Sequence, residues 1–280
     1  MRPQPSGGFA WVQAAGGQAL VCGALSPFAD HVFTTREWAL GSPAAMTDAD
    51  WEPVAASLGV DRAHLVRVHQ VHGASVVVRR VGDGPLPESR PDADVIVSND
   101  PSLALAIQAA DCVPLLVVDR ATGVVAAAHA GWRGLAAGVP GVIIAALARE
   151  FGGRPADLVA VAGPSVGACC YEVGADVLDA FRRGGFEEAV LRRWFLQTPR
   201  PTDRNPSMPG LPDARRADRW FFDGWAATRH QLEAAGVPAG QIYSAGLCTA
   251  SHPDAWCSYR RDGRAAGRIA GAIRCATPRP

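Results

Sequence analysis

The chain reads DCVPLLVVDRATGVVAAAHAGWRG from Asp111 to Gly134, and two apolar runs in it, 113–118 and 124–128, flank a short polar segment. Each run has the length and composition of a buried strand. The five residues between them, 119–123, end in glycine, as is typical of a hairpin loop. The stretch therefore predicts an antiparallel hairpin. Pro114 is expected at a strand start or edge, where its missing N–H does no harm.

Cys112 and His129 bracket this predicted hairpin. If Asp119 pairs with Gly123, the antiparallel register places Cys112 opposite residue 130, and a shift of one residue places it opposite His129. Either register brings the thiol and the imidazole to the same end of the hairpin. Cysteine and histidine are the usual zinc ligands, so the pair is a candidate metal site. The alternative is that both are ordinary core residues, with Cys112 acting as a small apolar side chain.

The segment Gln70-Val71-His72-Gly73 offers a third ligand. His69 and His72 are three residues apart, so on a strand they face opposite sides and at most one of them points at the ion. Three protein ligands would leave a fourth position open, as in catalytic zinc sites. A hydrogen-bonded core histidine is again the alternative.

Other cysteines offer a weaker candidate. Cys248, His252 and Cys257 lie close together in the sequence, but their spacing matches no specific zinc motif. The vicinal pair Cys169-Cys170 is expected to pack in the core or to line a site.

Composition excludes several function classes. The chain has 280 residues, 48% of them hydrophobic, and its 27 basic and 27 acidic residues cancel. A balanced charge argues against a protein that binds nucleic acid through a dominant basic surface. The sequence contains no lysine, which excludes a Schiff-base lysine and a Walker lysine. Any anion must therefore be held by arginine, histidine, backbone N–H groups or a metal.

The location of the protein is expected to be the cytoplasm. Residues 1–10 contain no apolar core of a secretory signal, and no window approaches the roughly 20 apolar residues of a membrane span. The seven cysteines are an odd number in a chain too large to need disulfides, which favours a reducing compartment.

Helices and strands alternate along the chain without a linker, which predicts one α+β domain over residues 1–280. Besides the hairpin, the patterns predict strands or hairpins within 1–30 and strands at 66–80, 95–97, 103–108, 158–162 and 242–247. They predict helices at 48–58, 136–151, 174–183, 220–235 and 268–275, and a mobile surface loop at 198–216.

Several catalytic signatures are missing from the sequence. It contains no H-E-x-x-H, no G-x-S-x-G and no G-x-G-x-x-G after a strand. The H-x-E and C-x-x-C pair of zinc deaminases and the His-x-His pairs of multicopper oxidases are absent too.

The residues around Cys112 and His129 resemble the multicopper polyphenol oxidoreductase family. This family is also called laccase-domain, purine nucleoside phosphorylase-like or peptidoglycan editing factor. The resemblance rests on five motifs in the family's order, which together cover roughly residues 66–270. They are 70–73 (QVHG), 110–116 (ADCVPLL), 128–135 (AHAGWRGL), 163–174 (GPSVGACCYEVG) and 258–263 (SYRRDG).

The resemblance implies a laccase-domain (cytotoxic necrotizing factor-like) α+β fold, with a central mixed sheet and flanking helices. It implies zinc, with copper less favoured, at His72, Cys112 and His129. It also implies phosphorolysis of adenosine, inosine, guanosine and methylthioadenosine, together with adenosine deamination. A hydrolase that edits peptidoglycan precursors and a copper-dependent polyphenol oxidase (laccase) are the alternatives, and a non-enzymatic binding protein is a weaker one.

Site roles follow as expectations. Asp111, Cys112 and His129 are the predicted catalytic residues, with Asp111 either orienting a ligand histidine or acting as acid and base. Predicted substrate-binding residues are Arg36, Gln70, Arg133, Arg260 and Arg261, since guanidinium groups bind phosphate bidentately. The alternative for the arginines is that they form surface ion pairs. The alternative for Asp111 is a turn or strand-cap role. Trp132 is expected either in the core or stacked on a purine.

The expected partners are a nucleoside and phosphate, and neither nucleic acid nor a membrane is expected to bind. The protein is expected to be a monomer or a small homo-oligomer. Arg36 is retained from the family's N-terminal motif, but the Gly-Gly-Val-Ser that usually follows is replaced. This departure bears on substrate specificity more than on the metal.

Overall fold

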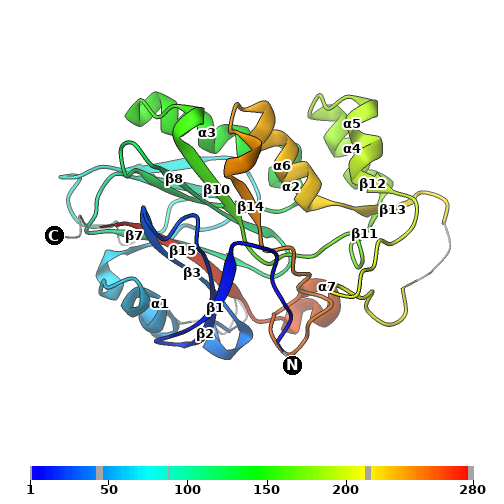
Figure 1. The fold of residues 1–280 in the computed structure, drawn as a ribbon, viewed down its shortest axis with the longest axis horizontal. Coiled ribbons are helices and arrows are strands. Elements are labelled where there is room, and N and C mark those ends of the chain that lie inside the picture. The colour runs from blue at the N-terminus through cyan, green and yellow to red at the C-terminus, as the bar shows by residue number, and fades with distance from the viewer. Residues whose placement is uncertain (1, 42–46, 88, 212–215, 277–280) are drawn as a thin grey trace.

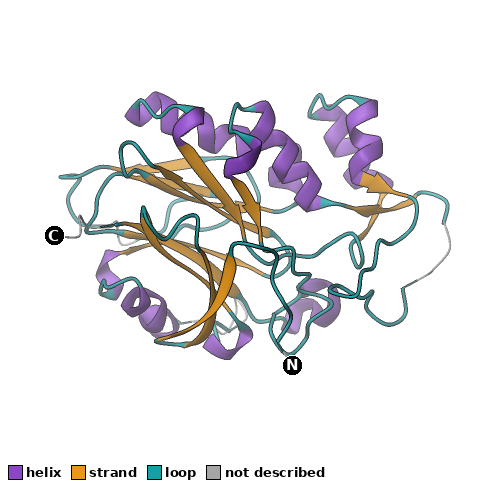
Figure 2. Cartoon of the chain, viewed as in Figure 1, coloured by secondary structure: helices purple, strands orange, loops and turns teal. Residues whose placement is uncertain are grey.

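The computed structural model describes residues 2–41, 47–87, 89–211 and 216–276. Two six-stranded mixed sheets lie face to face (Figures 1 and 2). The first sheet has the order β1 (Phe9–Ala14), β2 (Gly17–Cys22), β3 (Ala29–Thr34), β15 (Ile269–Cys275), β7 (Ala104–Ala109) and β4 (Leu65–Val66). The second has the order β14 (Ile242–Ser244), β10 (Leu158–Ala162), β8 (Val113–Asp119), β9 (Val125–Ala130), β6 (Val95–Ser98) and β5 (Val76–Arg79).

Helices cover the outer faces of both sheets (Figure 1). The helix α1 (Glu52–Ser57) packs on the first sheet. The helices α2 (Trp132–Ala136), α3 (Val139–Phe151) and α6 (Gly224–Ala234) pack on the second sheet. A small sheet of β11 (Glu172–Gly174), β13 (Arg219–Phe222) and β12 (Phe195–Leu196) lies beside α4 (Ala175–Arg183) and α5 (Glu188–Trp194). A last short helix is α7 (Tyr259–Asp262).

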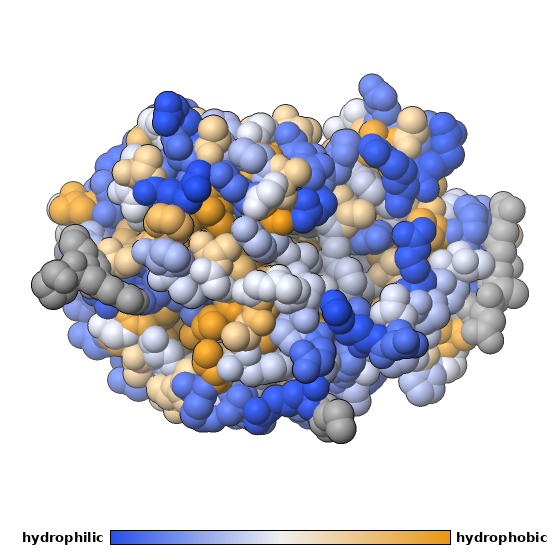
Figure 3. Space-filling model, viewed as in Figure 1, coloured by the Kyte–Doolittle hydropathy of each residue, from blue (hydrophilic) through white to orange (hydrophobic). Residues whose placement is uncertain are grey.

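The apolar runs that predicted the hairpin are explained by burial on both faces of the second sheet. Along β8, Leu115 and Val117 face the helices, whereas Leu116 and Val118 belong to the core between the two sheets. All four are fully buried. Side chains alternate along a strand, so a strand covered on both faces is apolar at every position. The outer surfaces of the helices in Figure 3 are mainly hydrophilic.

The predicted α+β class with mixed sheets is confirmed, and so are the strands at 95–97, 103–108 and 158–162 and the helix at 174–183. The helix expected at 136–151 is α3, preceded by the short α2, and the helix expected at 48–58 is a 3₁₀ turn followed by α1. The strand expected at 242–247 ends at Ser244, and the helix expected at 220–235 begins only after β13. The loop at 198–216 has no helix or strand in its described part; residues 212–215 lie outside the described residues.

The helix predicted at 268–275 is wrong, because these residues form β15 at the centre of the first sheet. Its alanines suit a helix by propensity, but tertiary packing overrides propensity. Ile269 and Ile273 face the core between the sheets, and Ala270 and Ala272 face α1. A Cβ at Gly271 would lie 3.0 Å from Pro114 Cβ, so glycine permits the close approach of the two sheets.

The continuous strand predicted at 66–80 is also wrong. The chain leaves β4 after Val66, runs irregularly through 67–75 and enters β5 at Val76. His72 adopts a left-handed backbone conformation, with φ +60°. No helix in the described ranges is long and apolar enough to cross a bilayer.

Candidate metal centre and cavity

The hairpin of β8 and β9 carries Cys112 and His129, but its register differs from both predicted registers. Pro114 pairs with His129, which places Cys112 opposite Gly131. The shift arises in the loop, where the Asp119 N–H donates to the Val124 carbonyl, so that Asp119 faces residue 124 and not Gly123. The two side chains still meet at one end of the hairpin.

His72 joins them from the irregular segment before β5. The ligand atoms of His72, Cys112 and His129 all lie within 4.8 Å of one another. The two imidazole rings are 4.8 Å apart between centroids and nearly perpendicular, at 79°. A thiol and two imidazoles are the soft and borderline donors that zinc and copper prefer. This Cys/His cluster can hold a metal ion, and its donor set does not by itself select which metal.

Asp94 positions both histidines, and the sequence analysis missed it. Its Oδ1 accepts hydrogen bonds from His129 Nδ1, at 2.7 Å, and from the His72 backbone N–H, at 3.1 Å. Its Oδ2 accepts from the N–H groups of Val71 and Gly73, at 3.2 and 2.6 Å. A carboxylate on Nδ1 would leave Nε2 of His129 as the atom available to a metal, as in the carboxylate–histidine pairs of zinc sites.

The residues of the cluster shift one another's pKa values. Burial alone would raise the pKa of Cys112, but the attraction and hydrogen bonds of His129 and His72 lower it to about 6. Burial alone would lower the pKa of His129, but the Cys112 and Asp94 charges raise it to about 9. Without a metal the pair is thus a thiolate and an imidazolium near pH 7. Metal binding would take a thiolate that is already formed and release the proton of His129.

Gly131 leaves the space that the thiol fills. A Cβ at this position would lie 2.7 Å from Cys112 Sγ and 3.3 Å from His72 Cδ2. Real side chains do not approach so closely, so only glycine fits opposite Cys112 in this register. The hairpin is therefore shaped to place sulfur beside the two imidazoles, which supports the fit of a metal.

The cluster opens into a cavity of about 780 Å³. This volume lies in the range of sites for small molecules. Besides the three candidate ligands, the residues that line it include Gln70, Asp111, Trp132, Tyr171 and four arginines, Arg90, Arg133, Arg260 and Arg268. A fourth metal position would face this cavity.

Three of these arginines have no carboxylate partner among the described residues. Arg133 lies over the Trp132 ring at 4.2 Å, and Arg260 lies over Tyr171 at 5.3 Å and donates to the Glu172 carbonyl. Arg268, which sequence reasoning missed, donates to the carbonyls of residues 266 and 267. Arg90, in contrast, pairs with Asp48. The three unpaired guanidinium groups give the cavity an excess of positive charge.

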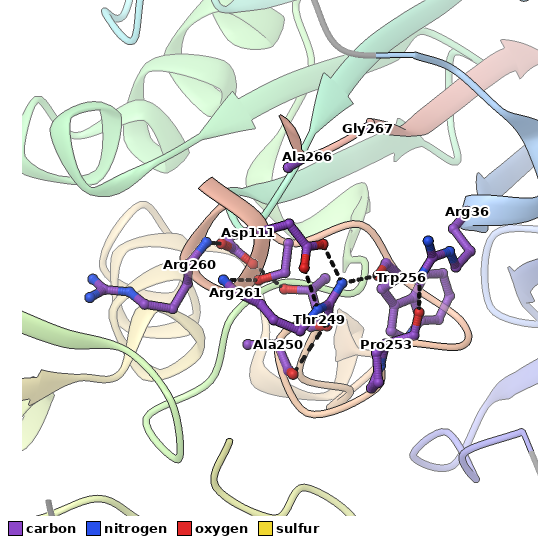
Figure 4. Close-up of polar contacts among 12 residues, drawn as sticks. Arg36, Asp111, Thr249, Ala250, Pro253, Trp256, Arg260, Arg261, Ala266 and Gly267 are labelled. Carbon is purple, nitrogen blue, oxygen red and sulfur yellow. Dashed lines mark hydrogen bonds and ion pairs between the residues drawn. The ribbon is translucent and has the colours of Figure 1, made fainter. Parts of the chain in front are cut away.

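Two predicted substrate-binding arginines lie outside this cavity. Figure 4 shows Arg36 bonded to the Pro253 carbonyl. Arg261 donates to the Thr249 and Trp256 carbonyls (Figure 4). It also pairs with Asp262. Both brace the loop before α7, and neither is among the residues that line the cavity.

Gln70 and Asp111 line the cavity, but their polar groups are engaged elsewhere. The Gln70 amide exchanges two hydrogen bonds with the backbone of Gln108, both of 2.8 Å. The Asp111 carboxylate accepts from Thr249 Oγ1 and from the Arg260 backbone N–H (Figure 4). Burial raises the pKa of Asp111. The carboxylate that bonds to a ring nitrogen of a candidate ligand histidine is that of Asp94, whereas Asp111 bonds to Thr249 and Arg260.

The weaker candidate cluster, predicted from Cys248, His252 and Cys257, has different members in the structure. The thiol of Cys248 gathers with those of Cys169 and Cys170, within 4.8 Å, and not with His252 and Cys257. All seven cysteines are unpaired.

Comparisons with known proteins agree on one group of relatives. Residues 39–276 match the family model of the multi-copper polyphenol oxidoreductase laccases. The protein named purine nucleoside phosphorylase SCO2081 of Streptomyces coelicolor is 36% identical over 241 residues, 84% of this chain and 85% of that protein. A protein named purine nucleoside phosphorylase of Bacteroides thetaiotaomicron is 37% identical over 180 residues, 64% of this chain and 60% of the relative. The alignment thus spans less than two thirds of this second relative.

Solved structures share the fold. The crystal structure of YlmD from Geobacillus stearothermophilus matches with a TM-score of 0.74 at 28% identity, over 95% of this chain and 99% of that one. That of the protein YfiH of Bacillus licheniformis matches with a TM-score of 0.76 at 26% identity, over 92% and 96%.

Proposed function

Because the chain belongs to the multi-copper polyphenol oxidoreductase laccase family, we propose that it is a zinc-dependent purine nucleoside phosphorylase of the cytoplasm. One observation carries this proposal. Arg133, Arg260 and Arg268 line the cavity that contains the Cys/His cluster, without carboxylate partners among the described residues. Two relatives at 36% and 37% identity bear the same activity in their names.

The arginines suit an anionic co-substrate. Guanidinium groups match phosphate oxygens in pairs and stay charged at any physiological pH. Burial lowers the pKa of Arg268, which marks a partly desolvated cation whose attraction for an anion is screened less than at the surface. These arginines would hold phosphate, and Trp132 and Tyr171, each with a guanidinium group over one face, would offer their other face to a purine.

In phosphorolysis a phosphate oxygen forms a bond to C1′ of the ribose as the bond from C1′ to the purine nitrogen breaks. The purine leaves with the electron pair of that bond and takes up a proton. The arginines would orient the attacking oxygen and offset the charge of the phosphate, which are positioning and electrostatic contributions.

His72, Cys112 and His129 are the proposed metal ligands, with Asp94 orienting both histidines. When bound, zinc would supply a Lewis acid that lowers the pKa of water at its open position. Deamination of adenosine requires that chemistry, and we propose it as a second activity of the site.

The test compares inosine and adenosine, each with and without inorganic phosphate, on purified protein whose zinc and copper are measured in parallel. We expect hypoxanthine and ribose 1-phosphate from inosine only when phosphate is present. Arg260→Ala should lose this reaction, whereas Arg154→Ala, an exposed arginine outside the cavity, should retain it.

The other outcomes separate the alternatives. Zinc-loaded protein that releases no base with phosphate would reject the proposal. Release of amino acids from a peptidoglycan precursor would identify the editing hydrolase, and oxidation of a phenol only with copper and dioxygen would identify the laccase.

A further inference from the structure

A second group of soft donors lies apart from the first one. The sulfur atoms of Cys169, Cys170 and Cys248 all lie within 4.8 Å of one another, and the three residues are 2%, 0% and 0% exposed. None of the three lines the large cavity. Cys169 and Cys170 belong to the turn before β11, whereas Cys248 follows β14 and pairs through a backbone bridge with Ser165.

Backbone N–H groups point at these sulfurs. The Gly167 N–H donates to Cys248 Sγ and the Met208 N–H donates to Cys170 Sγ, each at 3.3 Å. Such bonds stabilise negative charge on sulfur, and a metal-bound sulfur is a thiolate. Ser251 Oγ lies 3.5 Å from both Cys169 Sγ and Cys170 Sγ, so an oxygen donor stands beside the three sulfurs.

We propose that Cys169, Cys170 and Cys248 form a second, closed metal site that binds one zinc ion, with the Ser251 hydroxyl able to complete four-coordination. Three thiolates around Zn²⁺ leave one net negative charge, and around Cu⁺ they leave two. Uncompensated charge is costly in a buried site, so the divalent ion is favoured. Closed four-coordinate sites rich in cysteine are typical of structural zinc.

The proposed site lies against the segment 198–216, whose described part has no helix or strand of its own. The part of 198–216 that is described runs irregularly past the thiols. Several contacts hold it there, besides the bond from the Met208 N–H to Cys170. The Asn205 Oδ1 accepts from the Cys248 N–H, Ser207 Oγ donates to the Cys169 carbonyl, and the Pro206 carbonyl accepts from Ser251 Oγ. A metal at the thiols would tie the loop of Cys248 and Ser251 to the turn that leads into Tyr171, a residue of the cavity wall, and this segment is hydrogen-bonded to both.

The experiment counts zinc in the full-length chain and in variants that each remove one site. After equilibration with zinc and dialysis we expect about two zinc ions per chain in the wild type. Cys112→Ala and Cys248→Ser should each retain about one, and the double variant none. Cys275→Ser, a buried cysteine outside both clusters, should retain about two.

Cobalt gives a readout that identifies the ligands. In the Cys112→Ala background, cobalt(II) alone should produce the ultraviolet sulfur-to-cobalt charge-transfer band of a thiolate-rich site, and Cys170→Ser should weaken it. Because Cys170→Ser leaves two sulfurs in place, it tests the site even if Cys248→Ser does not fold.

Two results would overturn the inference. One is a Cys112→Ala chain that folds but binds neither zinc nor cobalt. The other is a disulfide among these three cysteines in protein purified without reductant. Neither result depends on nucleoside phosphorolysis, so the proposed function and this site can fail separately.

Discussion

Replacing Asp94 by asparagine should weaken both the metal site and the fold. Each carboxylate oxygen serves two donors: Oδ1 serves His129 Nδ1 and the His72 N–H, and Oδ2 serves the N–H groups of Val71 and Gly73. An asparagine amide has one oxygen, so its NH₂ group must face one of these pairs. Two donors then lose their acceptor, and at least one of them is a part-buried backbone N–H group.

The size of the effect follows from this count. An unsatisfied buried donor costs about 1–3 kcal/mol and a part-buried one less, so Asp94→Asn should destabilise the chain by about 1–4 kcal/mol. Loss of a carboxylate behind a ligand histidine typically costs about 10–100-fold in metal affinity. Burial opposes ionisation of Asp94, but the hydrogen bonds from His129 and Gly73 hold its pKa below the usual value. Its contribution is therefore present above about pH 4 and lost as the pH falls through the lowered pKa.

Urea denaturation of the metal-free protein and competition with a chromophoric chelator measure the two effects. Asp92→Asn is the matched control, since Asp92 lies two residues away, is exposed and bonds only to His69 Nδ1 through its side chain. It should change stability by no more than about 0.5 kcal/mol. If Asp94→Asn bound zinc as tightly as Asp92→Asn, the assigned role of Asp94 would be refuted.

Three further predictions concern the site. Gly131→Ala sets a methyl group against Cys112 Sγ and should weaken zinc binding by about tenfold or more in the chelator assay. Gly141→Ala is the control, because no described atom outside its own helix lies within 4 Å of a Cβ there. It should retain the affinity for zinc and stabilise α3 by about 0.5–1 kcal/mol. In metal-free protein, the rate at which iodoacetamide alkylates Cys112 should rise with pH around a midpoint near the pKa of about 6, because only the thiolate reacts. Peptide mass spectrometry measures this rate, and zinc should suppress the reaction. Arg268→Ala should raise KM for phosphate by about 10–100-fold in steady-state assays, since it removes a charge-assisted hydrogen-bond donor, whereas Arg154→Ala should not.

Each of the three has an outcome that would contradict it. For Gly131→Ala it is undiminished zinc affinity. For Cys112 it is an alkylation midpoint near pH 9, the value of an ordinary thiol. For Arg268→Ala it is an unchanged KM for phosphate.

Local sequence predicted the elements whose pattern and environment agree. The hairpin was predictable because both faces of β8 are buried and its loop ends at a glycine. The meeting of Cys112 and His129 was predictable because a hairpin brings its two ends together whatever the register, whereas the choice of His72 over His69 came from the family resemblance. The prediction of a single domain over residues 1–280 stays a prediction.

Three of the failures share one cause, which is pairing between distant segments. Asp94 could not be assigned because nothing near it in the sequence shows that β6 pairs with β9 and so faces His129. For β15, alanine favours a helix locally, and only the positions of β3 and β7 make this segment a central strand. Likewise Arg268 reaches the cavity only because β15 begins beside it.

X-ray absorption at the zinc edge of the Cys248→Ser chain, in which one zinc ion should remain, tests the central claim most directly. The account predicts one sulfur at about 2.3 Å and two imidazole nitrogens at about 2.0–2.1 Å, with one lighter atom completing the shell. A shell without sulfur, or one with two or more sulfurs, would contradict the assignment of His72, Cys112 and His129.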